Sequence, residues 1–266
     1  MTLNVCLAGA TGWAGSELAR GIAAAPDLMV VAGVSRSHAG RVIGDVLNHP
    51  RLTAHLYASA AEALATPCDV FVEFTKPDSA KANILCALQC GAHVVVGTSG
   101  LTEGDFAEID HLAREQQRGV LACGNFALTA VLLQKFAEAA AKRLPNWEIV
   151  EYGSATKADA PSGTVRELTL RLSQVRQPQV TIAPEQTVGL PETRGATVAG
   201  TQVHCVRLPG HVLGVDVIFG MPDQTLTLSH SAGSSALPYV DGALLAIRKV
   251  SDLVGVHRGL DQVLNV

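Results

Sequence analysis

The stretch that decides the fold is Val5-Cys6-Leu7-Ala8-Gly9-Ala10-Thr11-Gly12-Trp13-Ala14-Gly15. Its first four residues are apolar and predict a short buried strand, and glycines then recur at every third position as a helical pattern begins. Glycines allow a tight turn and a close approach of the backbone, so that a pyrophosphate can lie at the N-terminus of the helix.

A GxxGxxG spacing alone is weak evidence for nucleotide binding, and it also fits a glycine-rich turn in a nucleotide-free α/β domain. Because a second predicted strand follows about 20 residues later, we predict dinucleotide binding. The residues expected to contact the dinucleotide are Gly9, Thr11, Gly12, Trp13, Ala14 and Gly15.

The first half of the chain alternates short apolar runs with segments of helical period. The predicted strands are 4–8, 29–34, 69–73, 93–96 and 120–122, and the predicted helices are 15–25, 79–90 and 103–117. Asp78 or Ser79 is expected to cap the second of these helices, after Pro77. Such alternation predicts an α/β unit with a doubly wound parallel sheet.

The order of predicted elements changes in the second half of the chain, where strand-like runs follow one another with few helices between them. A helix over 128–144 precedes predicted strands at 147–152, 198–208, 212–219 and 224–230, with one further helix over 162–174. This order predicts a second, α+β domain with an antiparallel or mixed sheet. Residues 180–200 are expected to form an extended loop, and a last helix over 238–250 precedes a tail, 253–266, of helical spacing.

Composition excludes several classes of protein. Hydrophobic residues make up 48% of the chain and charged residues 17%, which argues against intrinsic disorder. The formal net charge is −4 and no basic run occurs, so we expect no nucleic-acid partner. The apolar stretches are far shorter than the roughly 20 residues of a membrane helix, and no signal peptide is recognisable, so we expect a cytoplasmic protein.

The six cysteines have no CxxC spacing. Cys86 and Cys90 would share a helix face, but we expect buried free thiols in preference to a metal site.

The end of the second predicted strand indicates which cofactor is bound. An NAD site normally carries an acid there, whereas this chain has Ser35 and Arg36. Serine hydroxyls and a guanidinium suit the 2′-phosphate of NADPH, so we expect NADPH to be preferred and NADH to remain possible. The alternative is that Arg36 and Arg41 are solvated loop residues.

Two later loops also follow predicted strands and should border the same cofactor. Their contact residues are expected to be Phe74, Thr75, Gly97, Thr98 and Ser99.

A lysine and a predicted helix N-terminus lie close together in Lys157-Ala158-Asp159-Ala160-Pro161-Ser162-Gly163-Thr164. The free N–H groups of the helix and the ammonium group would together bind a carboxylate. The alternative is an ordinary helix cap with a solvated lysine.

This segment resembles the K-x-D-x-P-S-G-T signature of the 4-hydroxy-tetrahydrodipicolinate reductase (dihydrodipicolinate reductase) family of lysine biosynthesis, and other segments agree. They are Glu73–Pro77 (D/E-F-T-x-P), Gly97–Gly100 (G-T-T-G), Gly124–Phe126 (N-F-S), His204–Gly210 (H-S-x-R-x-P-G) and the closing helix 242–250.

The resemblance implies an NAD(P)H-dependent oxidoreductase of the diaminopimelate pathway that transfers a hydride to a cyclic imine-like dicarboxylate, as a cytoplasmic homotetramer. It implies a dinucleotide-binding domain of residues 1–125 and 237–266, and a substrate-binding and oligomerisation domain of residues 126–236. Lys157 would bind a substrate carboxylate and assist protonation, Ser162, Gly163 and Thr164 would hold the same carboxylate, and Asn125 and Phe126 would contact the cofactor.

The chain departs from the family at three places. The family has two histidines, the first its presumed general acid, where this chain has Gly153 and Ser154. Losing one positioned acid costs roughly 10²–10⁴-fold in rate. The segment His230–Ser235 lacks the charged residue and the arginine usual in the family, and Trp13 replaces an arginine.

Three interpretations therefore stay open. The chain reduces the family substrate, with Lys157, Tyr152, His204, His230 or water supplying the proton. Alternatively, it reduces another carboxylate-bearing imine or ketone in a specialised pathway, or it binds a dinucleotide or a partner without catalysis.

Overall fold

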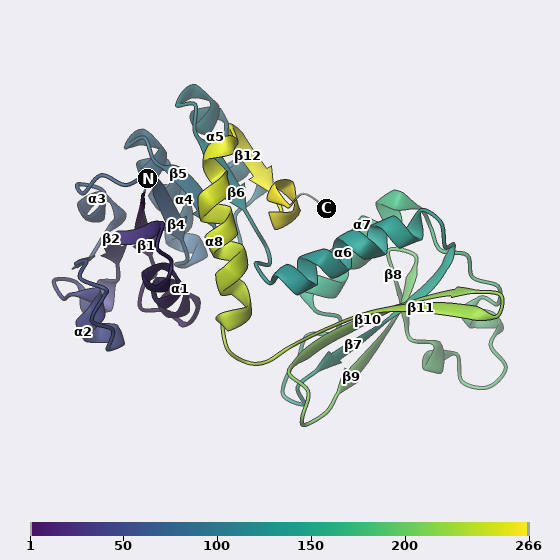
Figure 1. Cartoon of the computed structure of the whole chain (residues 1–266). Coiled ribbons are helices and arrows are strands. Elements are labelled where there is room, and N and C mark those ends of the chain that lie inside the picture. Colours follow the sequence, from purple (N-terminus) through teal and green to yellow (C-terminus); the bar gives the residue numbers. More distant parts are fainter. Residues whose placement is uncertain (1, 265–266) are drawn as a thin grey trace. The chain divides into compact units, whose positions relative to one another are not determined.

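The computed structural model describes residues 2–264, and Figure 1 labels its elements. The chain forms two compact units. The first comprises residues up to Leu128 together with those from Ala236 onward, and the second comprises Thr129–Ser235.

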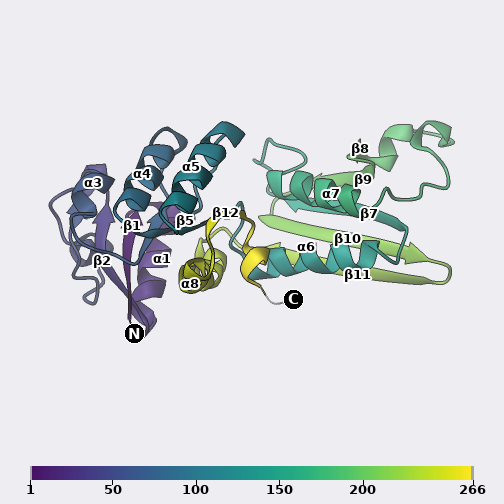
Figure 2. The ribbon, with the colours of Figure 1, turned by 90° about the horizontal axis from the view of Figure 1, so that it is seen from above.

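The first unit is built on a sheet of seven strands, in the order β12-β6-β5-β4-β1-β2-β3, and every neighbouring pair is parallel. The strands are β1 (Leu3–Ala8), β2 (Leu28–Val34), β3 (Leu56–Tyr57), β4 (Val70–Glu73), β5 (His93–Val96), β6 (Gly119–Ala122) and β12 (Gly255–Arg258). The helices are α1 (Trp13–Ala24), α2 (Ile43–Leu47), α3 (Ala60–Ala63), α4 (Pro77–Gln89), α5 (Glu103–Glu115) and α8 (Val240–Lys249). Figure 2 shows α1 and α8 on one face of this sheet and α3, α4 and α5 on the other. The predicted doubly wound sheet is confirmed.

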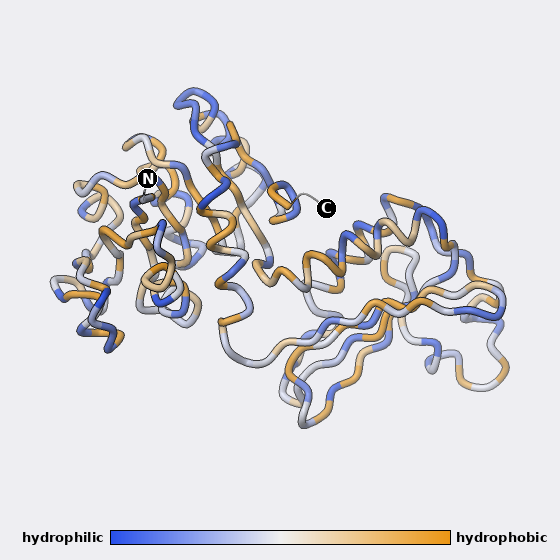
Figure 3. The backbone as a smooth tube through the Cα atoms, viewed as in Figure 1, coloured by the Kyte–Doolittle hydropathy of each residue, from blue (hydrophilic) through white to orange (hydrophobic). Residues whose placement is uncertain are grey.

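Burial explains why the sequence predicted the central strands correctly. Residues Val5–Ala8 of β1 and all of β4 are buried, because helices cover both faces of the sheet. A parallel strand of this kind is a continuous apolar run. In Figure 3, hydrophobic and hydrophilic residues alternate around α8, as expected for a helix with one face on a core.

The predicted helical tail was wrong over 255–258. Residues Gly255–Arg258 form β12, which pairs in parallel with β6 at the edge of the sheet. The Asp110 carboxylate anchors this strand by accepting a 2.7 Å hydrogen bond from the backbone N–H of Val256. Only the short 3₁₀ turn Leu260–Val263 follows, and residues 265–266 of the predicted tail lie outside the described residues.

The start of α4 also differs from the prediction. Lys76 is the N-cap, and Pro77 is the first helical residue, so neither Asp78 nor Ser79 caps the helix. Proline is favoured at this position because it lacks the N–H group that the helix would leave unpaired. The sequence patterns did not predict α2, β3 and α3, each of which has five residues or fewer.

The second unit has a mixed sheet of five strands, in the order β11-β10-β7-β9-β8. The strands are β7 (Asn146–Gly153), β8 (Ala196–Val198), β9 (Thr201–Arg207), β10 (Leu213–Met221) and β11 (Gln224–Ala232). Among the described strands of this second sheet, β7 and β9 pair in parallel and the other neighbours are antiparallel. Helices α6 (Leu128–Ala141) and α7 (Gly163–Val175) share one apolar core with this sheet, which includes Leu133, Leu168 and Ile149.

The predicted strand 198–208 is two strands joined by a tight turn. Ala199 and Gly200 adopt positive φ angles of 47° and 86°, and β8 reverses there into β9. The expected loop 180–200 contains two 3₁₀ turns, Pro184–Gln186 and Pro191–Arg194, as well as β8. None of the helices within residues 2–264 is both long and apolar enough to cross a membrane.

Candidate functional site

A cavity of about 940 Å³ lies at the carboxyl ends of the strands of the first unit. In parallel α/β sheets this edge is where ligands bind, and the volume suits a small organic ligand or cofactor. The cavity is lined by all but one of the residues predicted to bind a cofactor. These are Gly9, Thr11, Gly12, Trp13, Ala14, Ser35, Arg36, Phe74, Thr75, Gly97, Thr98, Ser99, Asn125 and Phe126.

Gly15 is the exception. A Cβ atom at Gly15 would lie 2.1 Å from the carbonyl oxygen of Gly9, so this glycine allows α1 to pack closely on the turn after β1. Gly9 itself has a φ of 80°, and a Cβ there would lie 2.2 Å from the carbonyl oxygen of Phe74. Gly12 is the N-cap of α1 and has no capping side chain, so the first-turn N–H groups of α1 remain open to an anion. The turn therefore fits the pyrophosphate of a dinucleotide.

The end of β2 offers hydroxyls and a cation to the cavity. The Ser35 hydroxyl is hydrogen-bonded to the Thr11 hydroxyl at 2.8 Å, and Arg36 lies beside it on the cavity wall. Arg41 does not line the cavity. Within residues 2–264, neither Arg36 nor Lys76, the second cation of this wall, has an ion-pair partner. Both are thus available to phosphate groups.

Aromatic side chains complete the walls. The rings of Phe74 and Phe126 lie 5.5 Å apart, and a Cβ at Gly97 would lie 2.3 Å from the Phe74 ring, so glycine is needed there. The ring of Trp13, which is 60% exposed, makes an edge-to-face contact with that of Tyr239 at 5.7 Å. The sequence placed the loop that contains Lys76 beside the cofactor without naming Lys76 as a contact, and it did not indicate Asn83 or Tyr239. Of these, Tyr239 carried no local signal, because tertiary packing alone brings it to the cavity.

A buried carboxylate supports the loops around this cavity. Glu73, the last residue of β4, accepts hydrogen bonds from the Thr75 backbone N–H, the Asn83 amide and the Thr75 and Thr98 hydroxyls. Burial raises the pKa of Glu73, and the hydrogen bonds from Thr75 and Asn83 oppose that rise.

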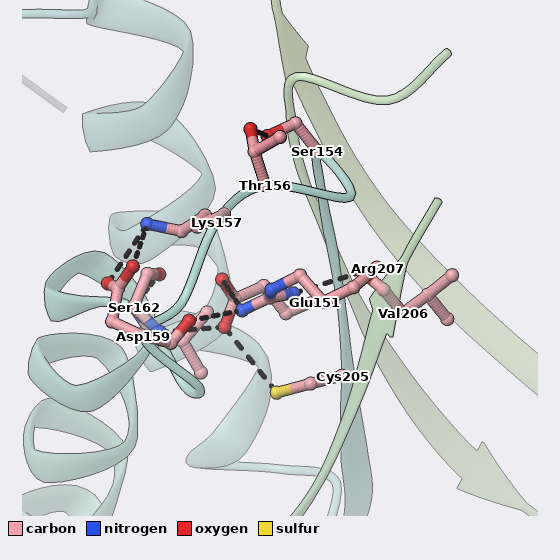
Figure 4. A network of polar contacts seen from close by, with 10 residues as sticks. Glu151, Ser154, Thr156, Lys157, Asp159, Ser162, Cys205, Val206 and Arg207 are labelled. Atoms are coloured by element: carbon pink, nitrogen blue, oxygen red, sulfur yellow. Dashed lines mark hydrogen bonds and ion pairs between the residues drawn. The ribbon is translucent and has the colours of Figure 1, made fainter. Parts of the chain in front are cut away.

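The second unit holds a separate polar cluster, shown in Figure 4. Glu151 of β7 is buried, and its carboxylate accepts hydrogen bonds from the Ser162 backbone N–H (2.8 Å) and the Arg207 guanidinium (3.0 Å). The same Arg207 nitrogen donates to the Asp159 carbonyl oxygen at 2.7 Å. Sequence reasoning did not predict a role for Glu151 or Arg207. The only signal was the position of Arg207 within the family-like segment 204–210.

The predicted carboxylate-binding residues gather at the start of α7. Ser162 is the N-cap, and its hydroxyl accepts a hydrogen bond from the Val165 N–H. In Figure 4, the Lys157 side chain ends beside Asp159, and its Nζ donates to both carboxylate oxygens, at 2.7 and 2.9 Å. A Cβ atom at Gly163 would have no neighbour within 4 Å among the described residues, and Thr164 follows in the first turn of α7. The hydrogen bond from Lys157 holds the pKa of Asp159 below its usual value.

Gly153 lies at the end of β7, where the family has its first histidine. A Cβ atom here would lie 3.0 Å from Cδ of Lys157 and 3.1 Å from Cζ of Arg207. These two side chains therefore border the space into which an imidazole would project.

Two of the candidate proton donors face away from this cluster. Side chains alternate along β7, so Tyr152 projects from the face opposite to Glu151 and Gly153. The Tyr152 hydroxyl donates to Asp216 at 3.0 Å, an interaction that raises the pKa of Tyr152. His204 is paired with Glu148 at 2.7 Å, on that same opposite face. Neither side chain is positioned with Lys157.

His230 lies on the helix-covered face and is almost fully buried. Its Nδ1 is 3.1 Å from the Thr129 hydroxyl, whereas its Nε2 has no hydrogen-bond partner among the described residues. Burial lowers the pKa of His230, so the ring is neutral at neutral pH.

The six cysteines differ in how deeply they are buried. Within the described chain, no group of three or more His, Cys, Asp or Glu residues is arranged to hold a metal ion. Cys90 is exposed and Cys86 is only partly buried, so the expected burial of these two thiols was wrong. The reason is that their side of α4 is only partly covered.

Comparison with known proteins places both units in one family. Residues 3–126 match the model described as "Dihydrodipicolinate reductase, N-terminus", and residues 129–264 match "Dihydrodipicolinate reductase, C-terminus". The chain belongs to the dihydrodipicolinate reductase family. It is 37% identical over 264 residues to 4-hydroxy-tetrahydrodipicolinate reductase from Desulfitobacterium hafniense, covering 98% of each chain. It is 35% identical to the enzyme of the same name from Oceanobacillus iheyensis, covering 99% of this chain and 100% of that one.

Solved structures agree with this assignment. A dihydrodipicolinate reductase from Paenisporosarcina sp. TG-14 with bound dipicolinate has a TM-score of 0.88 and 28% identity, covering 99% of this chain and all of the other. An amine dehydrogenase from Mycobacterium smegmatis, at 14% identity and a TM-score of 0.69, shares the fold. As a member of the reductase family, the chain is an NAD(P)H-dependent oxidoreductase.

Proposed function

We propose that this chain is a 4-hydroxy-tetrahydrodipicolinate reductase, which uses NAD(P)H to reduce a cyclic imine-like dicarboxylate in the diaminopimelate route to lysine. The observation that carries this proposal is similarity over the full length to reductases of that name, together with the Lys157 and Ser162–Thr164 cluster at the start of α7. When bound, the cofactor supplies the hydride, and the chain's own residues hold and orient the reactants.

NADPH is the preferred cofactor, and NADH is also accepted. The adenosine end would meet Ser35 and Arg36, which offer a hydroxyl and a guanidinium in place of the acid that binds the ribose of NAD. The pyrophosphate would be held by the N-terminus of α1, and the loops around Phe74, Thr98 and Asn125 would border the nicotinamide.

The substrate carboxylate binds in the second unit. Lys157 would turn from Asp159 to the carboxylate, while the backbone N–H groups of Gly163 and Thr164, in the first turn of α7, hold it. The proton comes from Lys157 or from water. Two observations support this assignment: Tyr152 and His204 project from the other face of the sheet, and the burial that lowers the pKa of His230 disfavours its protonated form.

The first unit is the dinucleotide-binding domain, with the boundaries 1–125 and 237–266, and residues 126–236 bind substrate and mediate oligomerisation. We propose a cytoplasmic homotetramer assembled through the second-unit sheet. Supporting this, α6 and α7 cover one face, while the alternate residues of β7, such as Val150 and Tyr152, stay partly exposed on the other. Light scattering of the purified protein tests the tetramer.

The test of the function is NADPH oxidation with enzymatically generated 4-hydroxy-tetrahydrodipicolinate, run beside a relative that has the histidine pair. Turnover within about tenfold of the relative supports the proposal, since one missing acid alone costs roughly 10²–10⁴-fold. A Lys157→Ala variant that binds NADPH normally is the matched control. Its rate should fall well below that of the unmodified chain.

The second candidate function is reduction of another carboxylate-bearing imine or ketone. Gly153 and Ser154 favour it, because the anion-binding cluster is retained while both histidines are gone. NADPH binding without turnover of the family substrate would point to this candidate, and a screen of such acceptors would then separate it from a protein that only binds the dinucleotide.

A further inference from the structure

Glu73 is a buried carboxylate. It ends β4 and is fully buried, and among residues 2–264 no lysine or arginine forms an ion pair with it. A charge in such a place is costly unless hydrogen bonds replace water. The groups that surround Glu73 should therefore stabilise its carboxylate.

Among the described residues, the donors to the Glu73 carboxylate are side chains and one backbone N–H of the cavity wall. The Thr75 N–H and the Asn83 amide each donate at 2.8 Å, the Thr98 hydroxyl donates at 3.2 Å, and the Thr75 hydroxyl donates as well. All three partners line the cavity. Because each partner offers a hydrogen to the carboxylate, the surroundings suit the ionised form.

The position of Glu73 in the sheet indicates which part of the cofactor it lies beneath. The glycine turn follows β1, and the adenosine-binding residues follow β2, on one side of β1. Strand β4 lies on the other side of β1, next to β5. In a doubly wound sheet the dinucleotide runs across this switch point, so the loops after β4 and β5 receive the nicotinamide.

A negative charge at that end distinguishes the two redox states of the cofactor. The dihydronicotinamide of NADPH is neutral, whereas the nicotinamide of NADP⁺ carries a positive charge that develops as the hydride leaves. A fixed negative charge in a poorly solvated site stabilises the charged ring more than the neutral one. An uncharged group of the same shape could position Thr75, Asn83 and Thr98, but it would not make this distinction.

We propose that Glu73 is a positioning residue whose buried negative charge holds the Thr75, Asn83 and Thr98 wall in place and selectively stabilises the oxidised nicotinamide. This inference rests on the proposed function only in taking the cavity to bind NAD(P)H. It adds an electrostatic contribution to hydride donation from a residue that does not itself line the cavity.

The experiment measures the dissociation constants of NADP⁺ and NADPH for the whole chain without substrate. Glu73→Gln removes the charge and keeps the shape, and it should weaken NADP⁺ relative to NADPH by roughly tenfold. Glu73→Asp keeps the charge and should keep the ratio of the two constants. Thr98→Val is the matched control, because it removes one donor and leaves the charge, and it should weaken both cofactors by a similar factor.

A second variant covers the case in which Glu73→Gln does not fold. Asn83→Lys places a cation beside the carboxylate and should shift the ratio in the same direction. An unchanged ratio in a folded Glu73→Gln or Asn83→Lys variant would overturn the inference. Failure of the unmodified chain to bind either cofactor would instead contradict the proposed function, so the two failures are distinguishable.

Discussion

The Glu151 carboxylate accepts a 2.8 Å hydrogen bond from the backbone N–H of Ser162, which joins the end of β7 to the N-cap of α7. Arg207 extends this link, because one of its nitrogens donates both to Glu151 and to the Asp159 carbonyl oxygen. One buried acid thus fixes both ends of the loop that carries Lys157. The proposed carboxylate site at the start of α7 thus depends on two residues that do not belong to the K-x-D-x-P-S-G-T signature.

Glu151→Ala should destabilise the second unit strongly. The substitution leaves Arg207 and the Ser162 N–H without their buried partner, and breaking a buried ion pair costs about 3–5 kcal/mol. Urea unfolding monitored by circular dichroism measures this loss. Glu151→Gln, which retains an acceptor for Ser162, should cost clearly less, and an equal loss in both variants would contradict the assigned role.

Arg36→Ala should weaken NADPH binding by about tenfold or more and change NADH binding little. The reason is that only NADPH has the 2′-phosphate for which the guanidinium is available at the end of β2. Fluorescence titration with each cofactor measures both constants. Arg41→Ala is the control, since Arg41 lies on the same loop but off the cavity wall. A similar loss for both cofactors in Arg36→Ala would remove the argument from the 2′-phosphate.

Lys157→Ala should lower kcat/KM by roughly a hundredfold and leave NADPH affinity unchanged. A lysine that binds a carboxylate contributes a charge-assisted contact of a few kcal/mol, and Lys157 belongs to the second unit, not to the cofactor cavity. Steady-state kinetics and a separate NADPH titration divide the two effects. A matched Thr156→Ala variant should behave like the unmodified chain, and a fall in NADPH affinity with Lys157→Ala would argue against its place at the substrate.

The sequence predicted the first unit better than the second, for a physical reason. Strands β1, β4 and β5 are covered on both faces, so each contains an apolar run of at least three residues, and their boundaries lie close to those predicted. Strand β12 lies at the sheet edge and contains His257 and Arg258, so periodicity did not distinguish it from the end of a helix.

The candidate sites show the same division. Residues on loops directly after strands, such as Ser35 and Thr98, were predictable because the topology brings those loops to one edge. Tyr239 and Arg207 were not, because their roles depend on packing between segments far apart in the sequence. The alternation along β7 could have placed Tyr152 on the face opposite to Glu151, but only once it was known which face of the sheet the helices cover.

Asp27 should make the stability of the first unit depend on acid pH. Its two carboxylate oxygens accept hydrogen bonds from Arg248 at 2.7 and 2.8 Å, which lower the pKa of Asp27 to about 2. The folded-state pKa lies below the unfolded value of about 4, so the stabilisation is complete above pH 4 and is lost as the pH falls toward 2. Asp27→Asn should lower the melting temperature slightly at pH 7, and the difference from the unmodified chain should shrink below pH 4 and be lost as the pH falls through about 2. A difference that stays constant over this range would contradict the linkage.

Gly153→His should raise the turnover of 4-hydroxy-tetrahydrodipicolinate, because it restores an imidazole at the end of β7 within reach of Lys157. The new Cβ would contact Cδ of Lys157 at 3.0 Å and the Arg207 guanidinium at 3.1 Å, so both side chains must shift by a few tenths of an ångström. Gly153→Ala introduces the same Cβ without the ring and measures that steric cost alone.

Relative to Gly153→Ala, we expect Gly153→His to increase kcat by at least about tenfold, with a new pH dependence near the pKa of an imidazole. Equal rates and equal pH profiles in the two variants would mean that the imidazole adds no proton donor at this position, and the substrate of the remodelled site would then have to be sought among other carboxylate-bearing imines and ketones.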